Sequence, residues 1–236
     1  MKLSVLAAAG AMLVATVAGA ATIPNTLDQL VSAGSTGITV GDKTFYDFSV
    51  SGGVTASQIN VIQAPGTDVG IEFQFNWSST NANNIDTLIR YKVHVNDTTP
   101  SQRMITGVSA HFDGNATGNS NIGTNATVTE SVSDLGGNVL GQISLFNAGS
   151  VGSAVNHNDG SFVLNTPTRD LMLAKDIMVH STTNNGTATI SLVDNTFQQT
   201  PASPSAIPLP PAAVMAISTI ALGAFGPIRR RILRRA

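Results

Sequence analysis

Strict alternation of apolar and polar residues is the feature that most constrains the fold of this chain. The segment 70–77 places four apolar and three polar residues on opposite sides: Ile71, Phe73, Phe75 and Trp77 against Glu72, Gln74 and Asn76. Asp86–Asn96 repeats the pattern. Successive side chains of a strand point to opposite faces, so this alternation predicts strands with one wet and one buried face. Such strands are typical of antiparallel sheets.

Further segments with strand character recur along the chain, separated by turn residues. They are Thr39–Val50 with a turn at Gly41 and Asp42, Ile59–Gln63, Met104–Phe112, Thr127–Val132, Val139–Phe146, Ser161–Leu164, Leu171–His180 and Thr187–Phe197. About ten strands of this kind predict an all-β fold, an antiparallel β-sandwich, and we favour a jelly-roll-like topology. Lys175 interrupts the apolar stripe of its strand, and Asp113–Asn125 is expected to be a loop.

One short helix is expected before the strands, at Thr26–Ser32. Thr26 and Gln29 have the spacing of a capping box, and Leu27, Leu30 and Val31 share one face. Gly34 is expected to end the helix. We assign residues 21–200 to the β-sandwich body.

The composition of the body limits its partners and its chemistry. The chain has no cysteine, which excludes disulfides, thiolate metal sites and cysteine nucleophiles. Residues 21–206 hold six basic and all fourteen acidic residues, hence a net charge of −8. An acidic surface disfavours nucleic acid as a partner. We expect no cofactor.

The N-terminus has the pattern of a secretory signal. Lys2 precedes an apolar run from Leu3 to Val17, and small residues follow at Ala18 and Ala20. Residues 1–20 are therefore expected to form a signal helix that signal peptidase removes between Ala20 and Ala21. A permanent N-terminal membrane helix is the alternative interpretation.

The C-terminus has the pattern of a membrane stop. A proline-rich linker, 201–211, precedes an uncharged run at 212–228 and a basic tail at 229–236. As a helix the uncharged run would be about 25 Å long, at the short end of what spans a bilayer. The basic residues are expected to remain cytoplasmic and leave the body outside; they are Arg229, Arg230, Arg231, Arg234 and Arg235. A processed tail, a permanent anchor and a buried C-terminal helix are the three interpretations, and we favour processing.

This order of proline motif, weakly apolar helix and arginine cluster resembles the PEP-CTERM sorting signal of bacteria that secrete exopolysaccharide. The motif here is Pro208, Leu209, Pro210 and Pro211, followed by Ala212, closer to a Pro-Leu-Pro-Ala variant than to Pro-Glu-Pro. The resemblance implies transient insertion in the inner membrane, cleavage by an exosortase-like enzyme and delivery to the cell surface or extracellular matrix.

No residue set in the body forms a clear catalytic motif. The four histidines, His94, His111, His157 and His180, lack the helical spacing of zinc ligands. The two glutamates, Glu72 and Glu130, would have to face each other across a cleft to act as a glycosidase pair. Oxygen ligands for calcium occur in two segments, Asp113–Asn115 and Asn156–Gly160, and neither matches an EF-hand loop. Tyr46 is the aromatic residue expected to face solvent.

We therefore expect an exported surface or matrix protein without enzymatic activity. A carbohydrate- or calcium-binding module on the same fold is the alternative, with extracellular polysaccharide as a partner. A glycan-processing enzyme is the third hypothesis.

Overall fold

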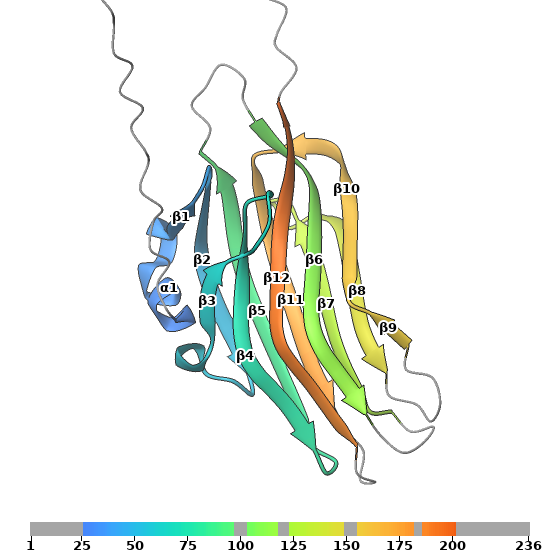
Figure 1. Cartoon of the computed structure of the whole chain (residues 1–236). Helices are drawn as coiled ribbons and strands as arrows, with labels where there is room; N and C mark the ends of the chain where they lie inside the picture. Colours follow the sequence, from blue (N-terminus) through green and yellow to red (C-terminus); the bar gives the residue numbers. More distant parts are fainter. Residues whose placement is uncertain (1–25, 97–102, 118–122, 149–154, 182–185, 202–236) are drawn as a thin grey trace, which may run out of the picture. The chain divides into compact units, whose positions relative to one another are not determined.

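The computed structural model describes residues 26–96, 103–117, 123–148, 155–181 and 186–201. Within these residues the protein is an all-β sandwich of two antiparallel sheets (Figure 1). The prediction of an all-β fold with antiparallel sheets is thereby confirmed. The predicted signal helix, sorting motif, membrane helix and basic tail lie outside the described residues, and no helix inside them is long and apolar enough to span a bilayer.

Sheet A has seven strands in the order β1-β2-β5-β11-β7-β8-β9. Their bounds are β1 Ile38–Val40, β2 Lys43–Gly52, β5 Asn84–Val95, β11 Asp170–His180, β7 Asn125–Ser133, β8 Val139–Ala148 and β9 Val155–His157. Sheet B has five strands in the order β10-β6-β12-β4-β3. Their bounds are β10 Asp159–Thr168, β6 Arg103–Thr117, β12 Thr187–Pro201, β4 Gly70–Thr80 and β3 Asn60–Gln63.

The chain crosses repeatedly between the two sheets. From β4 in sheet B the chain passes to β5 in sheet A and returns to β6 in sheet B. It then crosses to β7 and β8 in sheet A and returns to β10 in sheet B. Finally it crosses to β11 in sheet A and returns to β12 in sheet B. Each crossing places two strands that are consecutive in sequence on opposite layers. The last strand, β12, consequently lies between β4 and β6 in the middle of sheet B.

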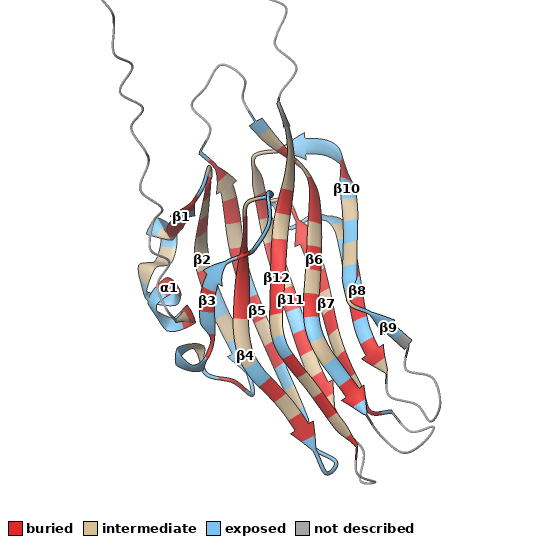
Figure 2. Ribbon diagram, viewed as in Figure 1, coloured by how far each residue is buried: buried red, intermediate tan, exposed pale blue. Residues whose placement is uncertain are grey.

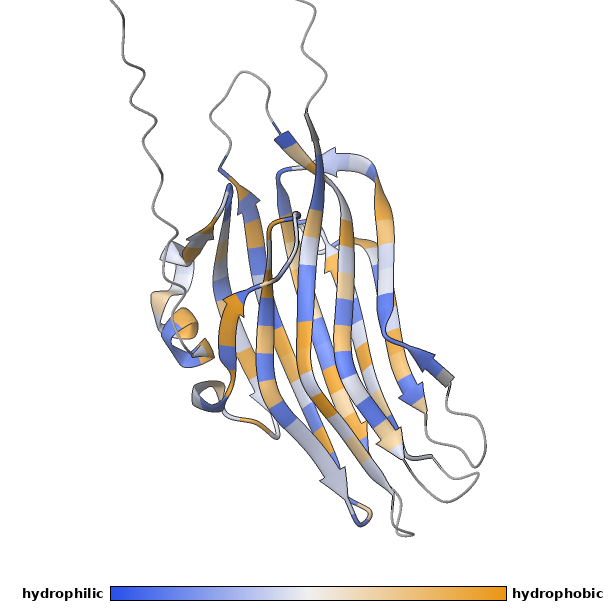
Figure 3. Ribbon diagram, in the orientation of Figure 1, coloured by the Kyte–Doolittle hydropathy of each residue, from blue (hydrophilic) through white to orange (hydrophobic). Residues whose placement is uncertain are grey.

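The core is formed by the inner faces of both sheets. Along the strands, buried apolar residues alternate with more exposed polar residues (Figures 2 and 3). Trp77 of β4 is fully buried, and its indole N–H donates to the Thr87 hydroxyl of β5 at 3.2 Å. Burial of large side chains of this kind supplies most of the stability of a sandwich without disulfides.

The short helix α1, Leu27–Ala33, is confirmed, and it closes one end of the core with Leu27 and Leu30. Thr26 occupies the N-cap position without a capping hydrogen bond from its side chain, so the predicted capping box is wrong. Gly34 ends the helix with φ of 55°, a conformation that glycine adopts without strain. Two 3₁₀ turns, η1 Gly34–Thr36 and η2 Ala56–Gln58, complete this end.

Two expectations about the strands need correction. The segment predicted as a loop from Asp113 is the end of β6 as far as Thr117, and β7 already begins at Asn125. Glu72 was predicted on a wet face, but only 4% of it is exposed. It lies opposite Asp194 of β12 and Ile62 of β3, and its carboxylate accepts a hydrogen bond from the Gln74 amide at 2.6 Å.

Candidate functional site

Lys175 interrupts the apolar stripe of β11 because it belongs to a polar cluster in the middle of the sandwich. Its side chain is fully buried, and its Nζ lies 2.5 Å from Glu130 Oε2 on the neighbouring strand β7. The two residues are direct cross-strand partners in sheet A. A buried charge is tolerated only when it is paired in this way.

Sheet B completes the cluster through Asn195 of β12. The Asn195 amide Nδ2 donates to Glu130 Oε1 at 2.8 Å and to the Ser109 carbonyl at 3.2 Å. Its Oδ1 accepts a hydrogen bond from the Tyr91 hydroxyl of β5 at 2.7 Å. We call Tyr91, Glu130, Lys175 and Asn195 the inner polar cluster.

Aromatic rings pack against Tyr91, one member of this cluster. The Tyr91 ring stacks on Phe48 with a centroid distance of 5.4 Å and contacts Phe45 and Phe73 at 6.2 and 5.8 Å. Burial, and then the negative charges of Glu130 and Asp194, raise the pKa of Tyr91 well above its ordinary value. The Tyr91 hydroxyl is therefore a permanent hydrogen-bond donor at physiological pH.

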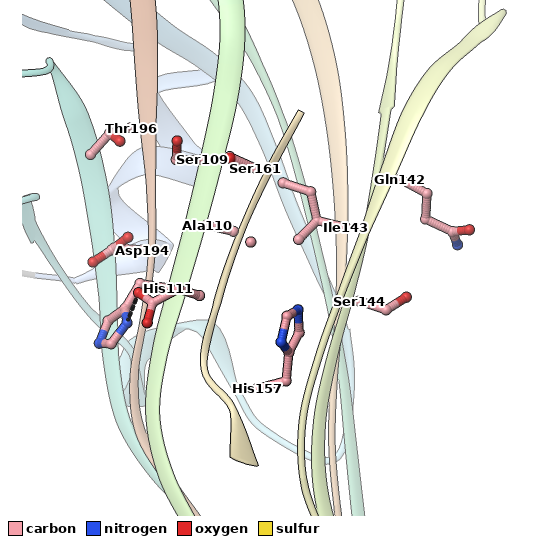
Figure 4. Close-up of a pocket in the computed structure, with 12 residues that line it drawn as sticks. Ser109, Ala110, His111, Gln142, Ile143, Ser144, His157, Ser161, Asp194 and Thr196 are labelled. Carbon is pink, nitrogen blue, oxygen red and sulfur yellow. Dashed lines mark hydrogen bonds and ion pairs between the residues drawn. The ribbon is translucent and has the colours of Figure 1, made fainter. Parts of the chain in front are cut away.

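A second polar region is a groove of about 670 Å³ near the edge where β8, β9 and β10 lie (Figure 4). His111 and Asp194 lie close together on one side of the groove, and His157 and Ser144 lie apart from them. His111 Nδ1 is 2.8 Å from Asp159 Oδ1. Burial raises the pKa of Asp194, although the charges of His111 and Lys175 oppose the shift.

The remaining predicted metal candidates do not converge. His94 pairs with Asp170 at 2.8 Å on the outer face of sheet A, and His180 ends β11. The Asp113 segment is strand, and Asp113 accepts from the Ser191 hydroxyl at 3.3 Å. In the part of the chain that the structure describes, no three His, Asp or Glu side chains could hold one ion.

The two glutamates do not face each other. Glu130 points into the core between the sheets, whereas Glu72 lies on the outer side of sheet B beside Gln74, which donates to it at 2.6 Å. Their strands, β7 and β4, belong to different sheets. The arrangement that a glycosidase pair needs is therefore absent for these two residues.

Tyr46 lies on the outer face of sheet A as predicted, but its ring is only half-exposed. Lys92 Nζ lies over the ring, 5.8 Å from its centroid. A small hollow of about 230 Å³ adjoins Tyr46, His94 and Asn96. The ring face is thus partly occupied by a cation rather than free for stacking.

The inner polar cluster was not predicted as a site. The break at Lys175 was visible in the sequence, but its partners come from three other strands in two sheets. The sequence carries no local signal for such long-range pairing.

Comparison of the sequence with protein-family models and with curated proteins gives no match. Several solved structures, the following three among them, are weakly similar. The enzymatically active domain of bacteriophage CBA120 tailspike protein 4 has 12% identity and a TM-score of 0.29, and the match covers 72% of this chain and 21% of that one. A family 22 carbohydrate-binding module from Clostridium thermocellum has 10% identity and a TM-score of 0.23, with 71% and 90% covered.

The third is a low-affinity xylan-binding module from Roseburia intestinalis, with 7% identity, a TM-score of 0.22, and 64% and 96% of the two chains covered. The chain spans only about a fifth of the tailspike chain. Similarities at this level establish neither a fold family nor a ligand for this chain.

Proposed function

We propose that this chain is an exported protein of the bacterial cell surface or extracellular matrix, delivered by its C-terminal sorting signal and without enzymatic turnover. The observation that carries the proposal is the order of the tail: the Pro208–Pro211 motif, the uncharged run 212–228 and the arginine cluster. The sandwich supports it, because two sheets with a shared core are complete between Leu27 and Pro201, where the proline-rich linker begins.

The experiment is to follow the full chain in a bacterium that carries an exosortase. We expect the surface or matrix fraction to contain protein that begins at Ala21 and lacks the arginine cluster. A variant with Pro208 and Pro210 both changed to alanine should keep its tail and remain in the inner membrane. Recovery of full-length protein with both termini intact from the cytosol would overturn the proposal.

The strand order supports a jelly-roll connectivity for the body. A jelly roll alternates eight strands between two sheets. Here the eight strands are β4-β12-β6-β10 in sheet B and β5-β11-β7-β8 in sheet A. The additional strands β1, β2, β3 and β9 extend the edges of the two sheets. The middle of β6, the middle of β8 and the start of β10 line the groove.

The groove favours a second candidate function, recognition of extracellular carbohydrate. It is lined mainly by short polar side chains and two histidines from five strands, including Ser109, His111, Ser144, His157 and Ser161. Hydroxyl, imidazole and carboxylate groups can exchange hydrogen bonds with sugar hydroxyls.

Affinity electrophoresis of the protein in gels containing the host's own exopolysaccharide tests this candidate. Retardation should be lost in H111A and kept in Y46A, which alters the separate hollow beside Tyr46, His94 and Asn96. Loss in Y46A alone would assign binding to that hollow. Retardation that disappears when calcium is chelated would favour the calcium-dependent alternative. If neither the wild type nor the variants are retarded, binding to this polymer is excluded.

A further inference from the structure

We propose that Lys175 and Asn195 become joined by an intramolecular isopeptide bond, with Glu130 as the catalytic residue. The bond would link β11 of sheet A to β12 of sheet B through the middle of the core. The proposal concerns the inner polar cluster alone and does not depend on how the protein is sorted.

The geometry brings a nucleophile and a leaving group to the same acid–base group. Lys175 Nζ is 2.5 Å from Glu130 Oε2, and Asn195 Nδ2 is 2.8 Å from Glu130 Oε1. One carboxyl group therefore contacts both nitrogens whose protons must move. A general acid–base catalyst has to lie within hydrogen-bond reach of each proton that it transfers.

The electrophile is oriented and polarised by its other contacts. Asn195 Oδ1 faces the Tyr91 hydroxyl, which can donate, whereas Nδ2 faces a carboxylate and the Ser109 carbonyl, which can only accept. These partners allow one orientation of the amide. The Tyr91 hydrogen bond withdraws electron density from the carbonyl and stabilises the negative charge that develops on Oδ1 during attack.

Burial makes the reaction feasible and protects it from hydrolysis. Lys175 and Asn195 are completely buried, and Tyr91 and Glu130 are 1% exposed. Proton transfer along the Lys175–Glu130 hydrogen bond would convert the ion pair to a carboxylic acid and a neutral amine, which has the lone pair that attack requires. Exclusion of water also removes the nucleophile that would compete with the amine for the amide carbonyl.

The step balances without any added reactant. Glu130 accepts a proton from the Lys175 ammonium, and the Nζ lone pair attacks Asn195 Cγ. In the tetrahedral intermediate Glu130 donates its proton to Nδ2 and accepts a second proton from Nζ, and the Cγ–Nδ2 bond breaks. The departing ammonia takes this proton as ammonium, which returns Glu130 to the carboxylate. The new bond is Nζ–Cγ, one ammonia molecule leaves as ammonium, and no atom is oxidised or reduced.

Such a bond would give the sandwich a covalent link between its sheets in a chain that has no cysteine. It would close the chain between Lys175 and Asn195 and lower the conformational freedom of the unfolded state, as a disulfide does. Unlike a disulfide, it would be unaffected by reducing agents.

Peptide mapping of the full chain tests the proposal directly. A protease that cleaves before aspartate releases Asp170–Lys175 and, separately, a peptide that begins at Asp194. We expect the two to be recovered as one branched species, lighter than their sum by one ammonia molecule, with fragment ions that place the branch at Lys175 and Asn195. Recovery of both as linear peptides from folded protein would overturn the proposal.

Two glutamate variants separate chemistry from packing. E130Q keeps the size of the side chain but cannot shuttle protons, so the branched species should be lost. E72Q changes the other buried glutamate, which lies outside the cluster, and should retain it. A branched species of equal yield in E130Q, or Asn195 recovered as linear aspartate in the wild type, would count against the mechanism. The peptide map of the wild type is sufficient to show whether the cross-link is present, so the proposal can be tested even if E130Q does not fold.

Discussion

Sheet A carries a lysine–carboxylate pair on each of its two faces, and the two pairs have different surroundings. On the inner face Lys175 and Glu130 are 0% and 1% exposed and lie 2.5 Å apart. On the outer face Lys92 and Asp47 are each about one-third exposed and lie 3.0 Å apart. The same two functional groups thus meet in the core and in water.

The difference shows what burial adds to an ion pair. In water either member of the outer pair can separate and be solvated, so the pair contributes little. In the core neither member of the inner pair can be solvated, so each depends on the other and on Asn195 and Tyr91. The inner pair is therefore fixed in one geometry, which is what chemistry between side chains requires.

The largest effect should come from removing one member of the inner pair. E130A leaves the Lys175 ammonium buried without its carboxylate and should lower the free energy of unfolding by about 3–5 kcal/mol. Urea denaturation measures this loss. The double variant E130L/K175M should recover the part of this loss that comes from the unpaired ammonium, because two apolar side chains need no partner. Neither variant can form the proposed isopeptide bond. If the two substitutions destabilise additively, the pair is not coupled and the comparison fails.

A smaller loss is expected when the hydroxyl of Tyr91 is removed. Y91F leaves Asn195 Oδ1 without its donor in the core and should cost about 1–3 kcal/mol. Y46F makes the same change on the outer face of the same sheet, where it should alter stability by less than about 0.5 kcal/mol. Equal effects in the two variants would mean that the inner hydrogen bond contributes nothing beyond a solvated one.

The fold class followed from the sequence because period-two alternation is a local signal. The segments around Trp77 and Tyr91 alternate cleanly, and both were assigned to strands whose apolar side is buried. Lys175 was recognised as a break in its stripe for the same reason. These predictions needed no knowledge of which strands become neighbours.

The inner polar cluster could not be derived in this way, because a bulge reverses the faces of β12. The register of β12 on β4 shifts between Ile190 and Leu192. Simple alternation from Ile190 would place Asp194 inside and Asn195 outside, whereas the shift turns Asn195 into the core and Asp194 toward the groove. A second shift, between Tyr46 and Ser49 of β2, lets both Phe45 and Phe48 face inward.

The outer pair should show the weak, screened behaviour of a surface contact. Asp47 has φ of 53°, which Asn tolerates, so D47N removes the charge without backbone strain. We expect a loss of about 0.2–1 kcal/mol at low salt, which shrinks as salt is added. D47A should lose more at every salt concentration, because alanine is strained at this φ. A loss of unfolding free energy in D47N that does not change with salt concentration would contradict a surface ion pair.

The same pair predicts a pH dependence at the alkaline end. The hydrogen bond from Lys92 to Asp47, together with the charge of Asp47, raises the pKa of Lys92 above 10.5, against a smaller effect of burial. The charged lysine is favoured in the folded state, so this contribution is complete below pH 10.5 and is lost as the pH rises through the raised pKa. D47N should flatten this part of the stability profile.

The smallest effect, and one of opposite sign, belongs to Asp176 on the outer face. Burial, and then a hydrogen bond with Asp86 and the charge of Asp86, raise the pKa of Asp176 above 3.8. The folded state therefore holds the proton more tightly than the unfolded state. Stability falls as the pH rises from 3.8 through the raised pKa, and the full cost is present at neutral pH. D176N should raise the thermal midpoint slightly at pH 7 and leave it unchanged below pH 3.8.

Asp134 provides the matched variant with the reverse sign. Hydrogen bonds from the side chain and the backbone N–H of Asn138 lower the pKa of Asp134 below 3.8. Its contribution to stability is present above pH 3.8 and is lost as the pH falls through the lowered pKa. D134N should therefore lower the thermal midpoint at pH 7, where D176N raises it. A fall of the midpoint in D176N would contradict repulsion between Asp86 and Asp176, and a rise in D134N would contradict stabilisation of the Asp134 carboxylate by Asn138.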